Sequence, residues 1–179
     1  TYNGEIFNYL DLKKKLMDEG AIFETTSDTE VLLKSYELWG KDCIEKFEGM
    51  FAFAIYDFKK KELIIARDRS GIKPLYYSRQ NNEFYFSSHM KGIIQNLKSK
   101  EINPVALNYQ FTLHSVVPAP HTIIKDIYKL EPGHTLSIDK SGKIYKRKYY
   151  DINEIDLLNY RENDISLLLK SSSLRLLKA

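Results

Sequence analysis

The residues best suited to chemistry stand at the start of the chain, from Asn3 to Asn8, in the order Asn-Gly-Glu-Ile-Phe-Asn. An asparagine beside a glycine can direct two N–H donors at one point, one from the Asn3 side-chain amide and one from the Gly4 backbone, because glycine lets the backbone approach a ligand closely. Two donors that converge on a developing alkoxide are what acyl transfer from an amide requires. An Asn-Gly pair is also a common turn, so the pair alone leaves both interpretations open.

The other reactive side chains offer no second candidate. Cys43 is the only cysteine, and it lies on an expected helical stretch between Gly40 and Phe47, so we interpret it as a buried structural thiol and not as a nucleophile. No Cys/His set has the spacing of zinc ligands, and no metal site is predicted. No role is assigned to the four scattered histidines, which are His89, His114, His121 and His134.

Two helices are expected near the N-terminus. Residues 8–19 carry a helical apolar pattern that stops at Gly20. Ser27 followed by Glu30 fits a capping box, and it predicts a second helix that ends at Gly40. Asp28 stands at the first position of that helix.

Strands are expected to follow these helices. The apolar, aromatic and turn patterns predict them at Met50–Phe58, Leu63–Ala66, Leu75–Tyr77, Phe84–Phe86, Leu136–Ile138 and Ile144–Tyr149. A further helix is expected to begin at Asn103-Pro104. Residues 154–163 are polar and are interpreted as a linker, and a last helix is expected at Ile165–Leu177. Helices, then a mostly antiparallel sheet, then a helical tail indicate an α+β fold with layered packing.

The composition limits the class of protein. The chain has 179 residues, of which 43% are apolar, and this suffices for one domain with a core. The 27 basic and 24 acidic residues leave a net charge of +3, too small to indicate nucleic-acid binding. No segment approaches the roughly 18 apolar residues of a membrane span, and the chain has no apolar targeting segment at its start. We therefore expect a soluble, cytoplasmic protein that binds neither nucleic acid nor membrane.

Five blocks of sequence, in one order, resemble the glutaminase domain of the asparagine synthetase family of class II glutamine amidotransferases. They cover residues 1 to about 150. The Asn3 to Asn8 segment is similar to the family's Asn-Gly-Glu-Ile-Tyr-Asn signature, and the other four blocks are Ser27–Val31, Glu48–Ala54, Arg67–Tyr77 and Val117–Gly133.

This resemblance implies an Ntn-hydrolase-like, four-layer αββα sandwich with antiparallel sheets, whose nucleophile is an N-terminal cysteine. Carried over by position, Asn3 and Gly4 form the oxyanion hole, and Glu5 and Asp28 hold the α-amino group of the substrate glutamine. For Asp28 the alternative is that it only opens a helix. The Arg67–Tyr77 run is expected to be structural, with an ion pair between Arg67 and Asp68.

The chain departs from the family pattern at both ends. The cysteine and the arginine expected to bind the glutamine carboxylate are missing, so we expect a fold that is incomplete at the N-terminus and a chain that is inactive alone. Thr1 is interpreted as a strand residue and not as a substitute nucleophile. The Ser-Gly-Gly-x-Asp-Ser phosphate loop is also missing. Internally, Ser70 replaces a usual aromatic residue, and His89 replaces a usual glutamate.

We therefore expect a glutaminase domain at residues 1–150. Residues 151–179 would form a linker and the first helix of a missing ATP-dependent synthetase domain, the intramolecular partner. No cofactor is expected here, since ATP and Mg²⁺ would belong to that second domain. The parent enzyme would hydrolyse glutamine and amidate aspartate to asparagine through an acyl-adenylate. A non-catalytic remnant, an amidotransferase for a sugar or an antibiotic precursor, and a homodimer all remain open.

Overall fold

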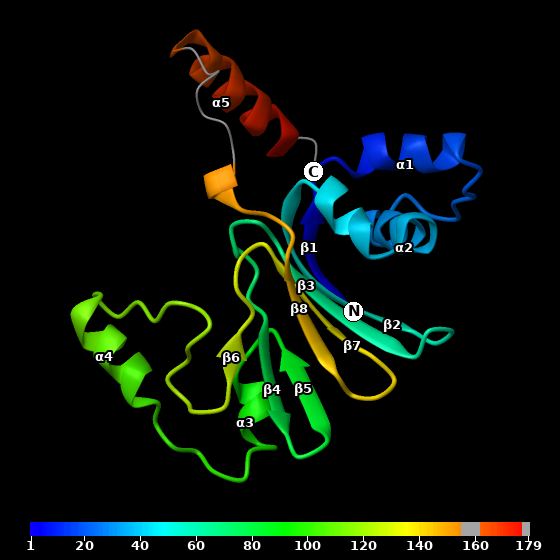
Figure 1. The fold of residues 1–179 in the computed structure, drawn as a ribbon. Coiled ribbons are helices and arrows are strands. Elements are labelled where there is room, and N and C mark those ends of the chain that lie inside the picture. The colour runs from blue at the N-terminus through cyan, green and yellow to red at the C-terminus, as the bar shows by residue number, and fades with distance from the viewer. Residues whose placement is uncertain (155–161, 177–179) are drawn as a thin grey trace.

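Two antiparallel sheets lie face to face in the computed structural model, which describes residues 1–154 and 162–176 (Figure 1). The larger sheet has the strand order β1-β2-β3-β7-β8, and the smaller has the order β5-β4-β6. The strands of the larger sheet are β1 (Tyr2–Ile6), β2 (Gly49–Asp57), β3 (Glu62–Arg67), β7 (His134–Ile138) and β8 (Ile144–Lys148). Those of the smaller sheet are β4 (Tyr76–Gln80), β5 (Glu83–Ser87) and β6 (Tyr128–Lys129).

Five helices in the described part of the chain occupy positions that the sequence predicts, with shifted ends. They are α1 (Tyr9–Asp18), α2 (Asp28–Trp39), the 3-10 helix η1 (Gly40–Lys46), α4 (Pro104–Thr112) and α5 (Glu162–Leu176). The sequence did not predict the short helix α3 (Lys91–Ile94) or the 3-10 helix η2 (Ile152–Glu154). The last helix begins three residues before the expected start at Ile165. Most of the expected linker at 154–163 lies outside the described residues.

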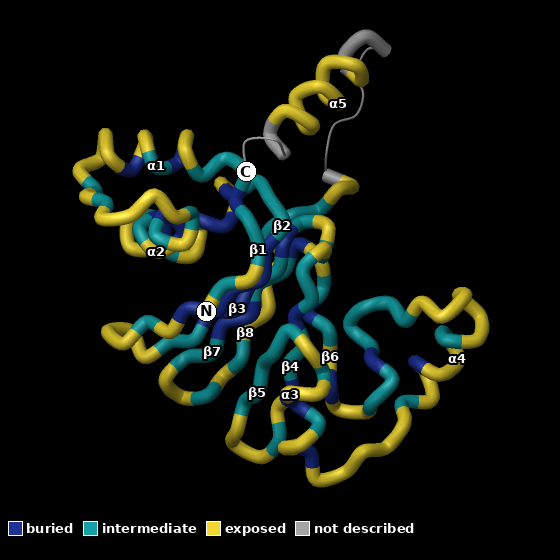
Figure 2. The backbone as a smooth tube through the Cα atoms, turned by 180° about the vertical axis from the view of Figure 1, so that it is seen from behind, coloured by how far each residue is buried: buried dark blue, intermediate teal, exposed yellow. Residues whose placement is uncertain are grey.

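Strand β2 separates two cores because its side chains alternate between the faces of the sheet. Phe51, Phe53 and Ile55 join the cluster under α1, α2 and η1. Ala52 and Ala54 join a second cluster between the two sheets. Alanine at these two positions lets the smaller sheet approach closely. Figure 2 shows buried residues along the central strands β2 and β3.

A third cluster covers the outer face of the smaller sheet. Ile93, Leu97 and Ile127 are its buried residues, and Tyr76 and Tyr85 from the sheet pack against them. The layers are therefore α1 and α2, the larger sheet, the smaller sheet, and α3. The predicted α+β class and the four-layer αββα arrangement are confirmed.

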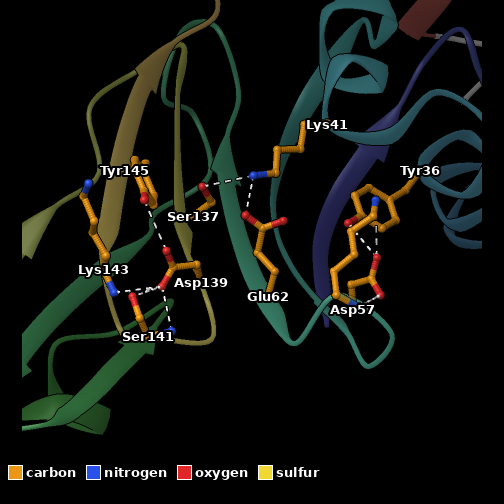
Figure 3. A network of polar contacts seen from close by, with 10 residues as sticks. Tyr36, Lys41, Asp57, Glu62, Ser137, Asp139, Ser141, Lys143 and Tyr145 are labelled. Carbon is orange, nitrogen blue, oxygen red and sulfur yellow. Dashed lines mark hydrogen bonds and ion pairs between the residues drawn. The ribbon is translucent and has the colours of Figure 1, made fainter.

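Polar contacts fix the helical layer to the larger sheet. The Lys41 ammonium of η1 lies between the Glu62 carboxylate of β3 and the Ser137 hydroxyl of β7 (Figure 3). Arg147 of β8 pairs with Asp42 and Glu45 of the same 3-10 helix. These contacts hold η1 across three strands.

The start of α2 differs in detail from the predicted capping box. The Ser27 hydroxyl accepts the Thr29 N–H at 3.1 Å, so Ser27 does cap the helix. The Glu30 carboxylate, however, accepts the N–H groups of Glu24 and Thr25. The reciprocal half of the box is therefore wrong, because Glu30 stabilises the preceding loop.

Candidate functional site

β1 is the edge strand of the larger sheet, and its register with β2 determines which way its N–H groups point. Thr1 and Ala54 exchange two backbone hydrogen bonds, both of 2.9 Å. Hydrogen-bonded pairs alternate with non-bonded pairs along an antiparallel ladder, so Asn3 opposite Ala52 is the next bonded pair. Gly4 stands between bonded pairs. Its N–H therefore points away from β2, toward the open edge.

Asp28 from the first turn of α2 lies at this same edge. Its Oδ2 accepts the Ile6 N–H at 3.2 Å and the Tyr2 hydroxyl at 2.5 Å. Ile6 and Gly4 are two residues apart, so their N–H groups point the same way. Burial, and then the hydrogen bond to Asp28, raise the pKa of Tyr2 above its usual range. The structure thus brings Gly4 N–H and the Asp28 carboxylate to one edge of one strand.

The Asn3 side chain projects from the face of β1 opposite to the face that bears the Tyr2 and Ile6 side chains. Tyr2 and Ile6 pack into the core under the helices, so the intervening Asn3 faces the smaller sheet. It is exposed, and it lines a cavity of about 250 Å³. The walls of this cavity come from β1, β2, the loop before β4 and the end of β5, through residues that include Ala52, Leu75 and Phe86.

The four predicted site residues therefore do not share one cavity. Asn3 lines the cavity between the sheets, whereas Gly4, Glu5 and Asp28 are not among its lining residues. Glu5 is half-buried, and it follows Gly4 opposite Met50 of β2. The shared element is β1, which presents the Asn3 amide on its face and the Gly4 N–H at its edge.

Glycine is required at position 4. Its φ of +148° is rarely adopted by other residues, and an added Cβ would meet the Met50 carbonyl oxygen at 2.2 Å and the Phe51 Cα at 2.6 Å. β1 and β2 therefore approach more closely here than two ordinary residues allow. The Gly4 N–H, which points to the edge of β1, therefore belongs to a peptide that packs tightly against β2 on its opposite side.

The loop after β3 differs from the predicted ion pair. The Arg67 guanidinium donates to the carbonyl oxygens of Gly71, Lys73 and Leu130 at 2.6 to 2.8 Å. The Asp68 carboxylate accepts backbone N–H groups. The expected Arg67–Asp68 ion pair is therefore wrong, since both side chains bind backbone groups of this region.

Neither Cys43 nor Thr1 is arranged as a nucleophile. Burial raises the pKa of the Cys43 thiol to about 12, so the reactive thiolate is scarce at neutral pH. The Thr1 backbone instead exchanges hydrogen bonds with Ala54 of β2, so Thr1 continues the ladder of β1, as the sequence analysis expects. Across residues 1–154 and 162–176, no group of three potential metal-ligating side chains occurs, and no helix is long and apolar enough to cross a membrane.

Sequence reasoning missed Tyr2, Ser87 and Ser88. Tyr2 binds Asp28, and the two serines line the cavity beside Asn3. Tyr2, Gly4 and Ile6 are spaced two residues apart in β1. This spacing was the feature of the sequence that could have placed Tyr2 on the same side of the strand as Ile6. Ser87 ends β5 and Ser88 follows it. Neither serine carried a signal in the sequence, because only the packing of the two sheets brings them near β1.

Comparison with known proteins identifies the family. The family model described as "Glutamine amidotransferase domain" matches residues 1–150. The chain belongs to this family. A putative glutamine-hydrolyzing asparagine synthetase 2 from Methanocaldococcus jannaschii is 45% identical over 153 residues, which cover 84% of this chain and 29% of the relative. Glutamine-hydrolyzing asparagine synthetase 3 of Bacillus subtilis is 41% identical over 142 residues, which cover 79% and 23%.

Solved structures agree on the fold. The chain superposes on glutamine phosphoribosylpyrophosphate amidotransferase from B. subtilis, complexed with ADP and GMP, with a TM-score of 0.57 at 22% identity. This match covers 84% of the chain and 28% of that structure. The fold is thus that of the Ntn-hydrolase amidotransferases. This glutamine amidotransferase domain spans less than a third of the length of either synthetase relative.

Proposed function

We propose that this amidotransferase domain releases ammonia from glutamine, and that its parent protein uses the ammonia to convert aspartate to asparagine. The observation that carries the proposal is the outward Gly4 N–H beside the Asp28 carboxylate at the edge of β1. A donor for an oxyanion and an acceptor for an ammonium are the two groups that recognition of glutamine during amide hydrolysis needs.

In the proposed reaction the nucleophile is an N-terminal cysteine of the parent protein, whose α-amine takes up the thiol proton. The sulfur attacks the amide carbon of glutamine, and the carbonyl oxygen becomes an oxyanion. Gly4 N–H and the Asn3 amide stabilise this oxyanion. The carbonyl then re-forms as the C–N bond breaks, and the α-ammonium of the cysteine returns its proton to the departing nitrogen, which leaves as ammonia. Water hydrolyses the thioester to glutamate and restores the thiol.

Glu5 and Asp28 are proposed to bind the α-amino group of glutamine. Both protein hydrogen bonds to Asp28 found in the described part of the chain use Oδ2. Oδ1 is therefore the natural acceptor for a substrate ammonium, and charge-assisted hydrogen bonds are the stronger kind. Tyr2 and Ile6 would hold the carboxylate in place for this contact.

The division of labour in the parent follows the family. Residues 1–150 would form the glutaminase domain, and 151–179 would lead into an ATP-dependent synthetase domain of the same polypeptide. ATP and Mg²⁺ would bind there and activate aspartate as an acyl-adenylate. Without the cysteine, the 179-residue chain would not hydrolyse glutamine alone.

A second candidate keeps the amidotransferase and changes the acceptor. Amidase chry2 of Gibberella zeae is 31% identical over 155 residues, which cover 86% of this chain and 22% of that protein. Relatives of this domain thus carry names other than asparagine synthetase. The acceptor, a sugar or an antibiotic precursor in this alternative, would be selected outside the glutaminase domain.

The test is an assay of the full-length gene product with glutamine, first alone and then with aspartate, ATP and Mg²⁺. Release of glutamate, with asparagine formed only in the complete mixture, supports the first proposal. Glutamate without asparagine favours the second. If calorimetry shows no glutamine binding and no ammonia is released, the chain is a non-catalytic remnant, and both proposals are wrong.

A further inference from the structure

One buried carboxylate lies behind the proposed oxyanion donor and has no role in the proposed reaction. Asp68 follows β3 and is 0% exposed. Its Oδ2 accepts the N–H groups of Phe51 and Lys73, at 3.3 and 3.0 Å. Its Oδ1 accepts the N–H groups of Ser70 and Ile72, both at 3.0 Å. A buried charge is tolerated only when it is well hydrogen-bonded, and these bonds supply that stabilisation.

The first consequence concerns Gly4. Asp68 binds Phe51 twice, since its backbone N–H also donates to the Phe51 carbonyl oxygen at 2.8 Å. Phe51 is the register partner of Gly4, and its Cα would lie 2.6 Å from a Cβ at position 4. The Gly4 backbone thus packs directly against the Phe51 backbone, and Asp68 binds Phe51 on the side that faces away from β1. We expect a shift of Phe51 to displace Gly4 and change the direction of its N–H.

The second consequence concerns the wall opposite Asn3. Pro74 and Leu75 line the same cavity as Asn3. The loop that leads to them is anchored through the N–H groups of Ser70, Ile72 and Lys73, which all donate to Asp68. One carboxylate therefore fixes both the backbone behind the donor and the loop that closes the cavity.

We propose that Asp68 is a positioning residue for glutamine hydrolysis, acting through Phe51 on the Gly4 N–H. The inference rests on the proposed function. It assigns to part of the Arg67–Tyr77 run a role in turnover that goes beyond stability. Glu5 and Asp28, which are proposed to bind the substrate ammonium, make no contact with Asp68 in the described residues, so substrate affinity should depend on it much less than turnover does.

The test uses Asp68→Asn in the full-length gene product. An amide nitrogen would face two backbone N–H donors in place of an acceptor, which pushes the peptides apart. We expect kcat for ammonia release to fall roughly a hundredfold while KM changes by less than about threefold, as is typical when a reacting geometry is displaced by about 1 Å.

Two controls separate this effect from general damage. Asp139 in the β7–β8 turn likewise accepts N–H groups, from Ser141 at 2.8 Å and Lys143 at 3.1 Å (Figure 3). It lies by the opposite edge of the sheet from β1, so Asp139→Asn should keep the turnover of the native protein. Leu16→Ala removes a fully buried side chain from α1 and reports the cost of destabilisation alone.

Each outcome decides a separate point. Native kcat in folded Asp68→Asn, or a loss that Leu16→Ala reproduces at equal stability, would overturn the positioning role. If Asp68→Asn does not fold, Asp68→Glu decides, because it keeps an acceptor carboxylate in a shifted position. Reduced kcat at native KM supports the role, and native kcat overturns it. A native protein without glutaminase activity instead refutes the proposed function, and the inference with it.

Discussion

Replacement of Gly4 by alanine tests how closely β1 is held against β2. The new methyl group would lie 2.2 Å from the Met50 carbonyl oxygen and 2.6 Å from the Phe51 Cα, both of which are backbone atoms of the ladder. A non-glycine residue at this φ costs about 1–3 kcal/mol, and relief of the overlap adds about 1–3 kcal/mol. We expect the free energy of unfolding of Gly4→Ala to fall by about 2–6 kcal/mol, which corresponds to a drop in Tm of roughly 5–20 °C.

Gly142 provides the matched control. It also has a positive φ, of +79°, but a Cβ there would meet no atom within 4 Å. Gly142→Ala should therefore show only the conformational cost of about 1–2 kcal/mol. Urea and thermal unfolding of the chain, followed by circular dichroism and by the fluorescence of Trp39, measure both variants. Equal stability of the two variants would refute the close approach of the strands at Gly4.

The remaining predictions concern Asp28 and Cys43. Asp28→Ala in the full-length protein should raise KM for glutamine roughly 10- to 100-fold and change kcat less, because a charge-assisted contact to the substrate is lost; a normal KM in steady-state assays would remove Asp28 from the binding site. The variant should also lose stability, because the Tyr2 hydroxyl and the Ile6 N–H lose their acceptor. Burial raises the pKa of Cys43 from 9.0 to about 12, so the unfolded chain releases the thiol proton at a lower pH than the folded chain does. The contribution of this group to the free energy of unfolding should therefore be complete below pH 9 and be lost as the pH rises toward 12. Urea midpoints across this range should fall more steeply for the native protein than for Cys43→Ala, and parallel curves would contradict the assignment.

Much of the fold was accessible from local pattern. Ser27 begins α2, and Gly40 ends it with a φ of +61°. Asn81, also at positive φ, turns β4 into β5 as its sequence predicts. The apolar run of β2 predicted a buried strand, and its alternation of aromatic residues with alanine matches the two cores that it separates. Each of these features depends on residues that are close together in the chain, so it could be predicted from the sequence alone.

Contacts between distant segments could not be read in this way. The Asp68 carboxylate binds Phe51, 17 residues earlier, and that contact depends on the register of β2 with β3. An ion pair with the adjacent Arg67 was the local alternative, but both side chains instead bind backbone groups of this region. The placement of Asp28 against β1 likewise depends on how α2 packs on the sheet. The candidate site was thus predicted as a set of residues, and its geometry was not.

The central claim is that the Asn3 amide and the Gly4 N–H act on one developing oxyanion, although one projects from the face of β1 and the other from its edge. Asn3→Ala in the full-length gene product tests it most directly, with ammonia release measured over a range of glutamine concentrations. We predict that kcat falls by roughly two to three orders of magnitude while KM for glutamine stays close to its native value. Native turnover in this variant would contradict the claim.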